Sequence, residues 1–190
     1  REDEMLKRIL GAFLMVLTFS GMFLAAHPLI TDDAGTQGKG KGQFEINFEY
    51  AHESSSGVVE NTNQIQTVLT FGVIDNVDFV VGFPYQFIST KAQGIKTTED
   101  GLADITLEVK WRFWEADGLS LALKPGISVP SGDDEKGLGA GEVGYSIFFI
   151  ATKELDPWAF HLNLGYRRNE NTVDERTDIW HVSLASELKV

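Results

Sequence analysis

Within residues 102–113, LADITLEVKWRF, apolar and polar side chains alternate without a break from Ala103 to Phe113, and no other feature of the sequence constrains the fold as strongly. The apolar row comprises Ala103, Ile105, Leu107, Val109, Trp111 and Phe113, and the row between them comprises Asp104, Thr106, Glu108, Lys110 and Arg112. A period of two places such rows on opposite faces of a β-strand, which a helical repeat would not do. The stretch therefore predicts a strand with one apolar face and one face that carries charges of both signs.

Similar alternation recurs along the chain, and it predicts seven further strands at 43–52, 63–73, 77–88, 119–130, 141–152, 158–167 and 178–190. Their connections are alternately short (74–76, 115–118, 153–157) and long (53–62, 89–100, 131–140, 168–177). Short periplasmic turns and longer external loops are typical of outer-membrane barrels, whereas a soluble sandwich has no reason to sort its connections in this way. We therefore predict an all-β, antiparallel, up-and-down transmembrane β-barrel with about eight strands in this chain.

Two details of the strands bear on this prediction. Aromatic residues fall near both ends of the predicted strands, as the two girdles at lipid interfaces do. Pro84 and Pro125 lie within predicted strands, and because each removes a ladder donor we expect a bulge or kink at both.

Composition narrows the classes of function. The chain has 190 residues, a net charge of -12 and no cysteine. The absence of cysteine excludes disulfides and thiolate metal sites, and the acidic balance argues against a nucleic-acid partner. Alternating strands of a membrane barrel need no high overall hydropathy, because half of their side chains face a polar interior.

The N-terminus has the pattern of an export signal. Lys7 and Arg8 precede an apolar run, 9–26, which predicts a signal peptide at 1–26, with a membrane anchor as the alternative. Polar, glycine-rich residues 27–42 follow, and they predict a flexible periplasmic segment that either forms a tail or plugs the barrel. Residues 43–190 form the predicted barrel.

The runs HPLITDDAGTQGKGKGQFEINFEY, GFPYQF, GLADITLEVKWRF and KPGISVPSGDDEKGLGAG resemble one bacterial outer-membrane family, the meta-pathway phenol degradation proteins, which are also called transporters. The resemblance runs from about residue 27 to the end of the chain. It implies an outer-membrane barrel with a role in the uptake of aromatic or other hydrophobic compounds. Members are typically longer and finish on an aromatic residue, whereas this chain ends SELKV, so we expect strands beyond Val190 and read the chain as an incomplete, C-terminally truncated part of a larger barrel.

Candidate chemical sites are few. His161 and His181 share the interior-facing parity of their strands, which is compatible with a metal or proton site or, as we favour, with polar filling that pairs with Glu187 or water. Acidic residues in 131–142 could bind Ca²⁺, although solvated loop charge explains them better. Because no nucleophile, metal-hydrolase or phosphate-loop motif is present, we predict no enzyme activity, no cofactor and no metal.

The predicted function is passive transport of small, aromatic or hydrophobic compounds through a channel in the bacterial outer membrane. The predicted lumen-lining residues are Gln64, Gln66, Asp104, Glu108, Lys110, Arg112, Lys124, His161, Arg167, His181 and Glu187. The expected partners are outer-membrane lipid and a small solute, and the oligomeric state stays open. Two alternatives remain: a filled structural or adhesive barrel without a pore, and a soluble periplasmic barrel that binds an apolar ligand.

Overall fold

A computed structural model of the chain describes residues 31–55, 57–169 and 177–189. Nearly all of this part is antiparallel sheet. The strands are β1 (Gly42–Ser55), β2 (Val58–Ile74), β3 (Val77–Ala92), β4 (Ile95–Leu102), β5 (Ile105–Ala116), β6 (Leu119–Val129), β7 (Gly144–Leu155), β8 (Trp158–Arg168) and β9 (Asp178–Leu188). One turn of 3₁₀ helix, η1 (Asp134–Lys136), lies between β6 and β7. No helix among the described residues has the length and apolarity that a membrane-crossing helix requires.

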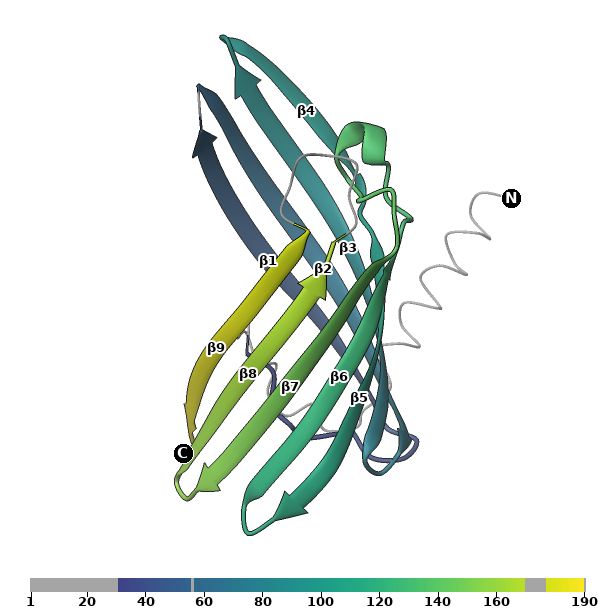
Figure 1. Cartoon of the computed structure of the whole chain (residues 1–190), viewed down its shortest axis with the longest axis vertical. Helices are drawn as coiled ribbons and strands as arrows, with labels where there is room; N and C mark the ends of the chain where they lie inside the picture. The colour runs from purple at the N-terminus through teal and green to yellow at the C-terminus, as the bar shows by residue number, and fades with distance from the viewer. Residues whose placement is uncertain (1–30, 56, 170–176, 190) are drawn as a thin grey trace, which may run out of the picture.

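The sheet follows the chain order and curls into an open half-barrel (Figure 1). Its order is β1-β2-β3-β5-β6-β7-β8-β9, and β4 pairs with β3 beyond the end of β5. Among the described strands, β1 pairs only with β2 and β9 only with β8, so the curl is not closed. The tight turns that follow β2, β5 and β7 gather at one end, which we call the short-turn end (Figure 1). The all-β, up-and-down prediction is confirmed.

The two rows of β5 face as the alternation predicts. Val109 and Trp111 are 41% and 47% exposed on the convex face, whereas Lys110 between them is 7% exposed on the concave face. The same alternation runs through β8, where Ala159, His161, Asn163 and Gly165 are buried between exposed or half-buried apolar residues. The wall is therefore apolar outside and polar inside.

Exposed aromatic side chains of the convex face gather toward the two ends of the strands. Those near the short turns are Phe44, Phe71, Phe79, Trp111, Phe113, Trp114, Trp158 and Phe160, and those toward the other end include Tyr50, Phe87, Tyr145 and Trp180. Some form ring pairs, such as Tyr166 with Trp180 at 5.0 Å between centroids. This distribution agrees with the two predicted girdles.

Two expectations about the strands were wrong. The connections 53–62 and 89–100 are extensions of hairpins rather than loops, and the second of them contains β4, which brings the described strands to nine, in agreement with the predicted count of about eight. Both faces of these extensions are largely polar, and they are held by backbone pairing and by side-chain hydrogen bonds such as that from Thr90 Oγ1 to Glu60 at 2.9 Å. The sequence gives no periodic signal for such a hairpin.

The expected bulges at the prolines are also absent from the structure. The β2–β3 register is continuous through Pro84, and the β6–β7 register is continuous through Pro125. Pro84 instead lies where the partner of β3 changes from β4 to β5, a gap in which no ladder donor is needed. The register shifts occur at Gly72–Ile74 and at Arg112–Trp114, and the second adds Trp114 to the exposed aromatics.

Candidate functional site

The concave face collects the polar rows of the strands, and it carries the predicted lumen residues. Those that border an open hollow on the side of the long connections are Gln64, Gln66, Asp104, Glu108 and Arg167. Those nearer the short-turn end are Lys110, Arg112 and Lys124, and those on β8 and β9 are His161, His181 and Glu187. That a solute contacts any of them stays a prediction.

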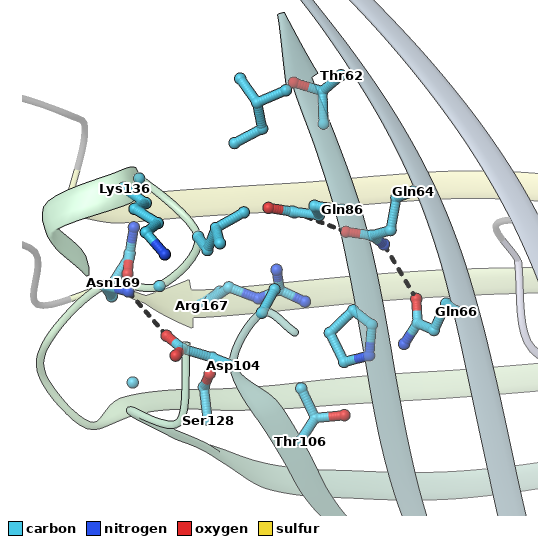
Figure 2. Close-up of a pocket in the computed structure, with 18 of the residues that line it drawn as sticks. Thr62, Gln64, Gln66, Gln86, Asp104, Thr106, Ser128, Lys136, Arg167 and Asn169 are labelled. Carbon is cyan, nitrogen blue, oxygen red and sulfur yellow. Dashed lines mark hydrogen bonds between the residues drawn. The ribbon is translucent and has the colours of Figure 1, made fainter. Parts of the chain in front are cut away.

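The hollow has a volume of about 720 Å³, and its wall on β2 and β3 carries a ladder of neutral amides (Figure 2). Gln86 Nε2 donates to Gln64 Oε1 at 2.8 Å, and Gln64 Nε2 donates to Gln66 Oε1 at 3.5 Å. Thr106, Ser128 and Arg167 face the same space (Figure 2). The wall thus offers several hydrogen-bonding groups to water or to a solute.

The connection between β6 and β7 folds over this hollow because Asp104 holds it. The carboxylate of Asp104 accepts hydrogen bonds from three backbone N–H groups, those of Ser131 at 3.1 Å, Gly132 at 3.0 Å and Ala140 at 2.8 Å. Leu138 in the same connection is buried. A Cβ atom on Gly139 would lie 2.5 Å from the Asp104 carboxylate, so glycine is required for this approach. The GLAD and PSGD motifs therefore form one clamp.

The acidic residues of this connection do not converge. Asp133 pairs with Lys136 at 3.3 Å, and Asp134 and Glu135 are exposed. Within the described part of the chain, no group of three His, Cys, Asp or Glu side chains is placed to hold a metal ion.

Residues 31–41, which we call the N-terminal segment, lie against the concave face toward the short-turn end. The predicted signal peptide (1–26) and residues 27–30 lie outside the described residues. The segment is anchored at Asp32, whose carboxylate accepts from Lys110 Nζ and from Lys124 Nζ, each at 2.9 Å. Asn163 holds the backbone of Asp32, donating to its carbonyl at 2.7 Å and accepting from its N–H at 2.8 Å.

The ion pairs of Asp32 favour the position of the N-terminal segment on the concave face. Burial raises the pKa of the Asp32 carboxyl, but the ammonium groups of Lys110 and Lys124 outweigh it and hold the pKa well below the ordinary value of 3.8. A carboxyl with a lowered pKa contributes its full stabilisation above its ordinary pKa and loses it as the pH falls below that value. The ion pairs are therefore fully formed at neutral pH.

Further contacts fix the rest of the segment. Ala34 is fully buried beside Ala122, Ile150 and Phe148, and its N–H donates to Thr152 Oγ1 at 2.9 Å. The N–H of Gln37 donates to both carboxylate oxygens of Asp78, at 3.1 and 3.0 Å. Asp78 is only 1% exposed, so this segment satisfies a buried carboxylate of the wall.

The segment ends by pairing with β2. The N–H of Gly40 donates to the carbonyl of Gly72 at 2.8 Å, and the N–H of Gly72 donates to the carbonyl of Lys41 at 2.9 Å. A Cβ atom on Gly72 would lie 1.9 Å from the carbonyl oxygen of Gly38, so only glycine allows this approach.

The two histidines predicted to face the interior lie at different levels of the β8–β9 hairpin. His161 lies opposite Ala185, and His181 lies opposite Gly165, so they are four residues apart along β8. His161 contacts Thr152 Oγ1 at 3.0 Å and lies 4.0 Å from the carboxylate of Glu187. His181 instead lies 3.0 Å from Ser183 Oγ. The structure therefore does not bring the two rings together.

Sequence reasoning missed several residues of this cluster. Asp78, Phe148 and Asn163 occupy inward positions between outward apolar residues, so the same alternation could have identified them. Asp32 could not be placed in this way, because the segment around it has no repeating pattern.

A family model described as "Putative MetA-pathway of phenol degradation" matches residues 25–190. The match covers most of the chain, so the chain belongs to this family, as its motifs indicated. No curated protein matches the chain.

The clamp at Asp104 generates one prediction. Asp104→Asn keeps the shape but replaces a charged acceptor of three N–H groups with an amide, which should cost about 1.5–3 kcal/mol of local stability. Hydrogen exchange at the Gly132 and Ala140 amides should accelerate roughly 10- to 100-fold as a result. Asp133→Asn, at an exposed carboxylate of the same connection, should leave these rates unchanged. Equal protection in the native chain and in Asp104→Asn would contradict the clamp.

The close approach of Gly72 to Gly38 leads to a second prediction. Gly72→Ala should push the backbone at Gly38 away and expose the Gly40 amide, raising its exchange rate by at least about tenfold. Gly82→Ala is the matched control, because the atoms its Cβ would meet are the ends of the Thr106 and Gln66 side chains, which can rotate away. Exchange at Gly40 that stays as slow in Gly72→Ala as in the native chain would contradict the close approach of Gly72 to Gly38.

Proposed function

We propose that this member of the phenol-degradation family is a non-enzymatic channel of the bacterial outer membrane, exported by an N-terminal signal peptide, which passes small solutes passively through its lumen. The observation that carries the proposal is the division of the wall into an apolar convex face and a hydrogen-bonding concave face with a hollow of about 720 Å³. A soluble barrel would need the opposite arrangement.

The convex face supports a location in lipid. In a bilayer, side chains of the outer row contact acyl chains, and aromatic residues are favoured at the two interfaces. Exposed Leu69, Val109 and Ile147 lie between the aromatic groups at the strand ends. A bilayer also demands that backbone groups be paired. Strands β2, β3, β5, β6, β7 and β8 have a partner on each side, whereas β1, β4 and β9 each have one partner among the described strands.

The concave face supports a water-filled path. Its charged residues at the hollow have both signs, and they are Glu60, Glu99, Asp104, Glu108, Glu135, Lys136, Arg167 and Arg168. Such mixed charge gives weak ion selectivity, and the clamped β6–β7 connection narrows the path and sets a size limit. The family description favours aromatic compounds among the solutes.

The N-terminal segment closes this path in the proposed resting state. It occupies the lumen between the hollow and the short-turn end, where it is held by Asp32, Gln37 and Ala34. Passage of a solute therefore requires the segment to move aside.

The Asp32 ion pairs provide the test. Asp32→Asn removes the anion from between Lys110 and Lys124 and should release the segment, so proteoliposomes with the full chain should leak a neutral pentose several-fold faster than those with the native protein. Asp133→Asn has the same chemistry at an exposed site and should leak like the native protein.

Two outcomes would count against the channel. If neither the native protein nor Asp32→Asn leaks solute at high protein load, the lumen is filled and the structural or adhesive role gains support. Recovery of the protein in the soluble periplasm without detergent would instead favour a soluble ligand-binding barrel.

A further inference from the structure

We propose that Lys110, Lys124 and Phe148 form a lumenal binding site for aromatic monocarboxylates, and that Asp32 of the N-terminal segment occupies it as an internal ligand. The inference rests on the proposed channel function and specifies which solutes open it.

The two lysines need an anion between them. The β5–β6 register runs from Glu108 opposite Gly126 to Trp111 opposite Leu123, which places Lys110 opposite Lys124. Like charges directly opposite each other on neighbouring strands repel, and both ammonium groups are largely buried. The Asp32 carboxylate resolves this repulsion by giving one oxygen to each ammonium, both at 2.9 Å.

The occupant is replaceable because it belongs to the segment and not to the wall. Among the described residues, the ion pairs of Lys110 are with Asp32 at 2.9 Å and Asp33 at 4.0 Å, both on the segment. Lys124 has one wall partner, Glu108, at the longer distance of 3.7 Å. When the segment leaves, the two ammonium groups lose their closest anion, and a solute carboxylate is the matching substitute.

An aromatic ring completes the site. Phe148 lies opposite Lys124 on β7, and the Lys124 ammonium is 5.6 Å from the centre of its ring. Phe148 also packs against the buried cluster that contains Ala34 of the segment and meets the ring of His181 edge-on. Departure of the segment uncovers an apolar ring beside two ammonium groups, which matches a solute that carries an aryl group and a carboxylate.

The surrounding charges limit the ligand to a single negative charge. Glu108 and Asp78 remain on the wall after the segment leaves, and together they offset the charges of Lys110 and Lys124. A monoanion replaces Asp32 charge for charge, whereas a dianion brings an additional uncompensated charge. The site therefore favours benzoate over phthalate.

Binding and opening are coupled in this arrangement. The solute and Asp32 compete for the same two ammonium groups, so a solute that binds only the vacated site shifts the population toward the released segment. Removal of the Asp32 carboxylate should conversely strengthen solute binding.

The test uses the full chain in detergent micelles, with 4-fluorobenzoate as the probe and ¹⁹F NMR as the measurement of binding. Asp32→Asn should bind the probe at least about tenfold more tightly than the native chain, and Lys124→Gln in the Asp32→Asn background should reverse this gain. Lys96→Gln, at an exposed lysine of β4, is the matched control and should change nothing. Equal probe affinity in the native chain, Asp32→Asn and the double variant would overturn the site.

Release of the segment has a separate readout. The chain has no cysteine, so Ala34→Cys places a single thiol at a fully buried position of the segment. Benzoate should accelerate its reaction with a charged maleimide several-fold, whereas benzyl alcohol, which lacks the carboxylate, and phthalate should have little effect. Equal acceleration by benzyl alcohol would overturn the role of the lysines. If the pentose leak of Asp32→Asn persists while 4-fluorobenzoate shows no binding, the site fails but the channel stands.

Discussion

The strict alternation of side chains across paired strands is the constraint on which the rest of this structure depends. Backbone hydrogen bonds fix each strand in register, and the pleat then assigns every side chain to one of two faces. Val109 and Lys110 are neighbours in the chain, yet the first is exposed outside and the second is buried inside. A slip of one residue in any pair would exchange these environments, so the apolar convex face and the charged concave face specify the register together.

The charges that this sorting places inside create a second requirement. Lys110, Lys124 and Asp78 are inward and largely buried, and a buried charge is costly unless it is paired. The N-terminal segment meets that requirement with the Asp32 carboxylate for the lysines and the Gln37 N–H for Asp78. In the proposed channel, the same contacts that stabilise the segment also close the path, and the proposed solute acts by replacing one of them.

The strands of the sheet were easier to predict from the sequence than the segment and the side-chain contacts on its concave face. The strand at 102–113 was identifiable because each residue repeats the same two-residue pattern, and this pattern also placed His161 and Lys110 inside. The hairpin that contains β4 was not identifiable, because its two faces are both polar. The position of Asp32 depends on contacts with Lys110 and Lys124, which lie far from it in the sequence. The separation of His161 from His181 depends on the register of the β8–β9 hairpin. Neither leaves a local signal in the sequence.

A nitroxide scan of β5 in lipid vesicles tests the central claim most directly, because the native chain contains no cysteine to interfere with single labels. Oxygen, which concentrates in the hydrocarbon, should relax labels at Leu107, Val109 and Trp111 most strongly. A water-soluble nickel chelate should relax labels at Thr106 and Glu108 most strongly. The oxygen and nickel profiles along β5 should therefore alternate out of phase. Profiles without this alternation, or with the chelate favouring the apolar row, would contradict an outer face in lipid and an inner face in water.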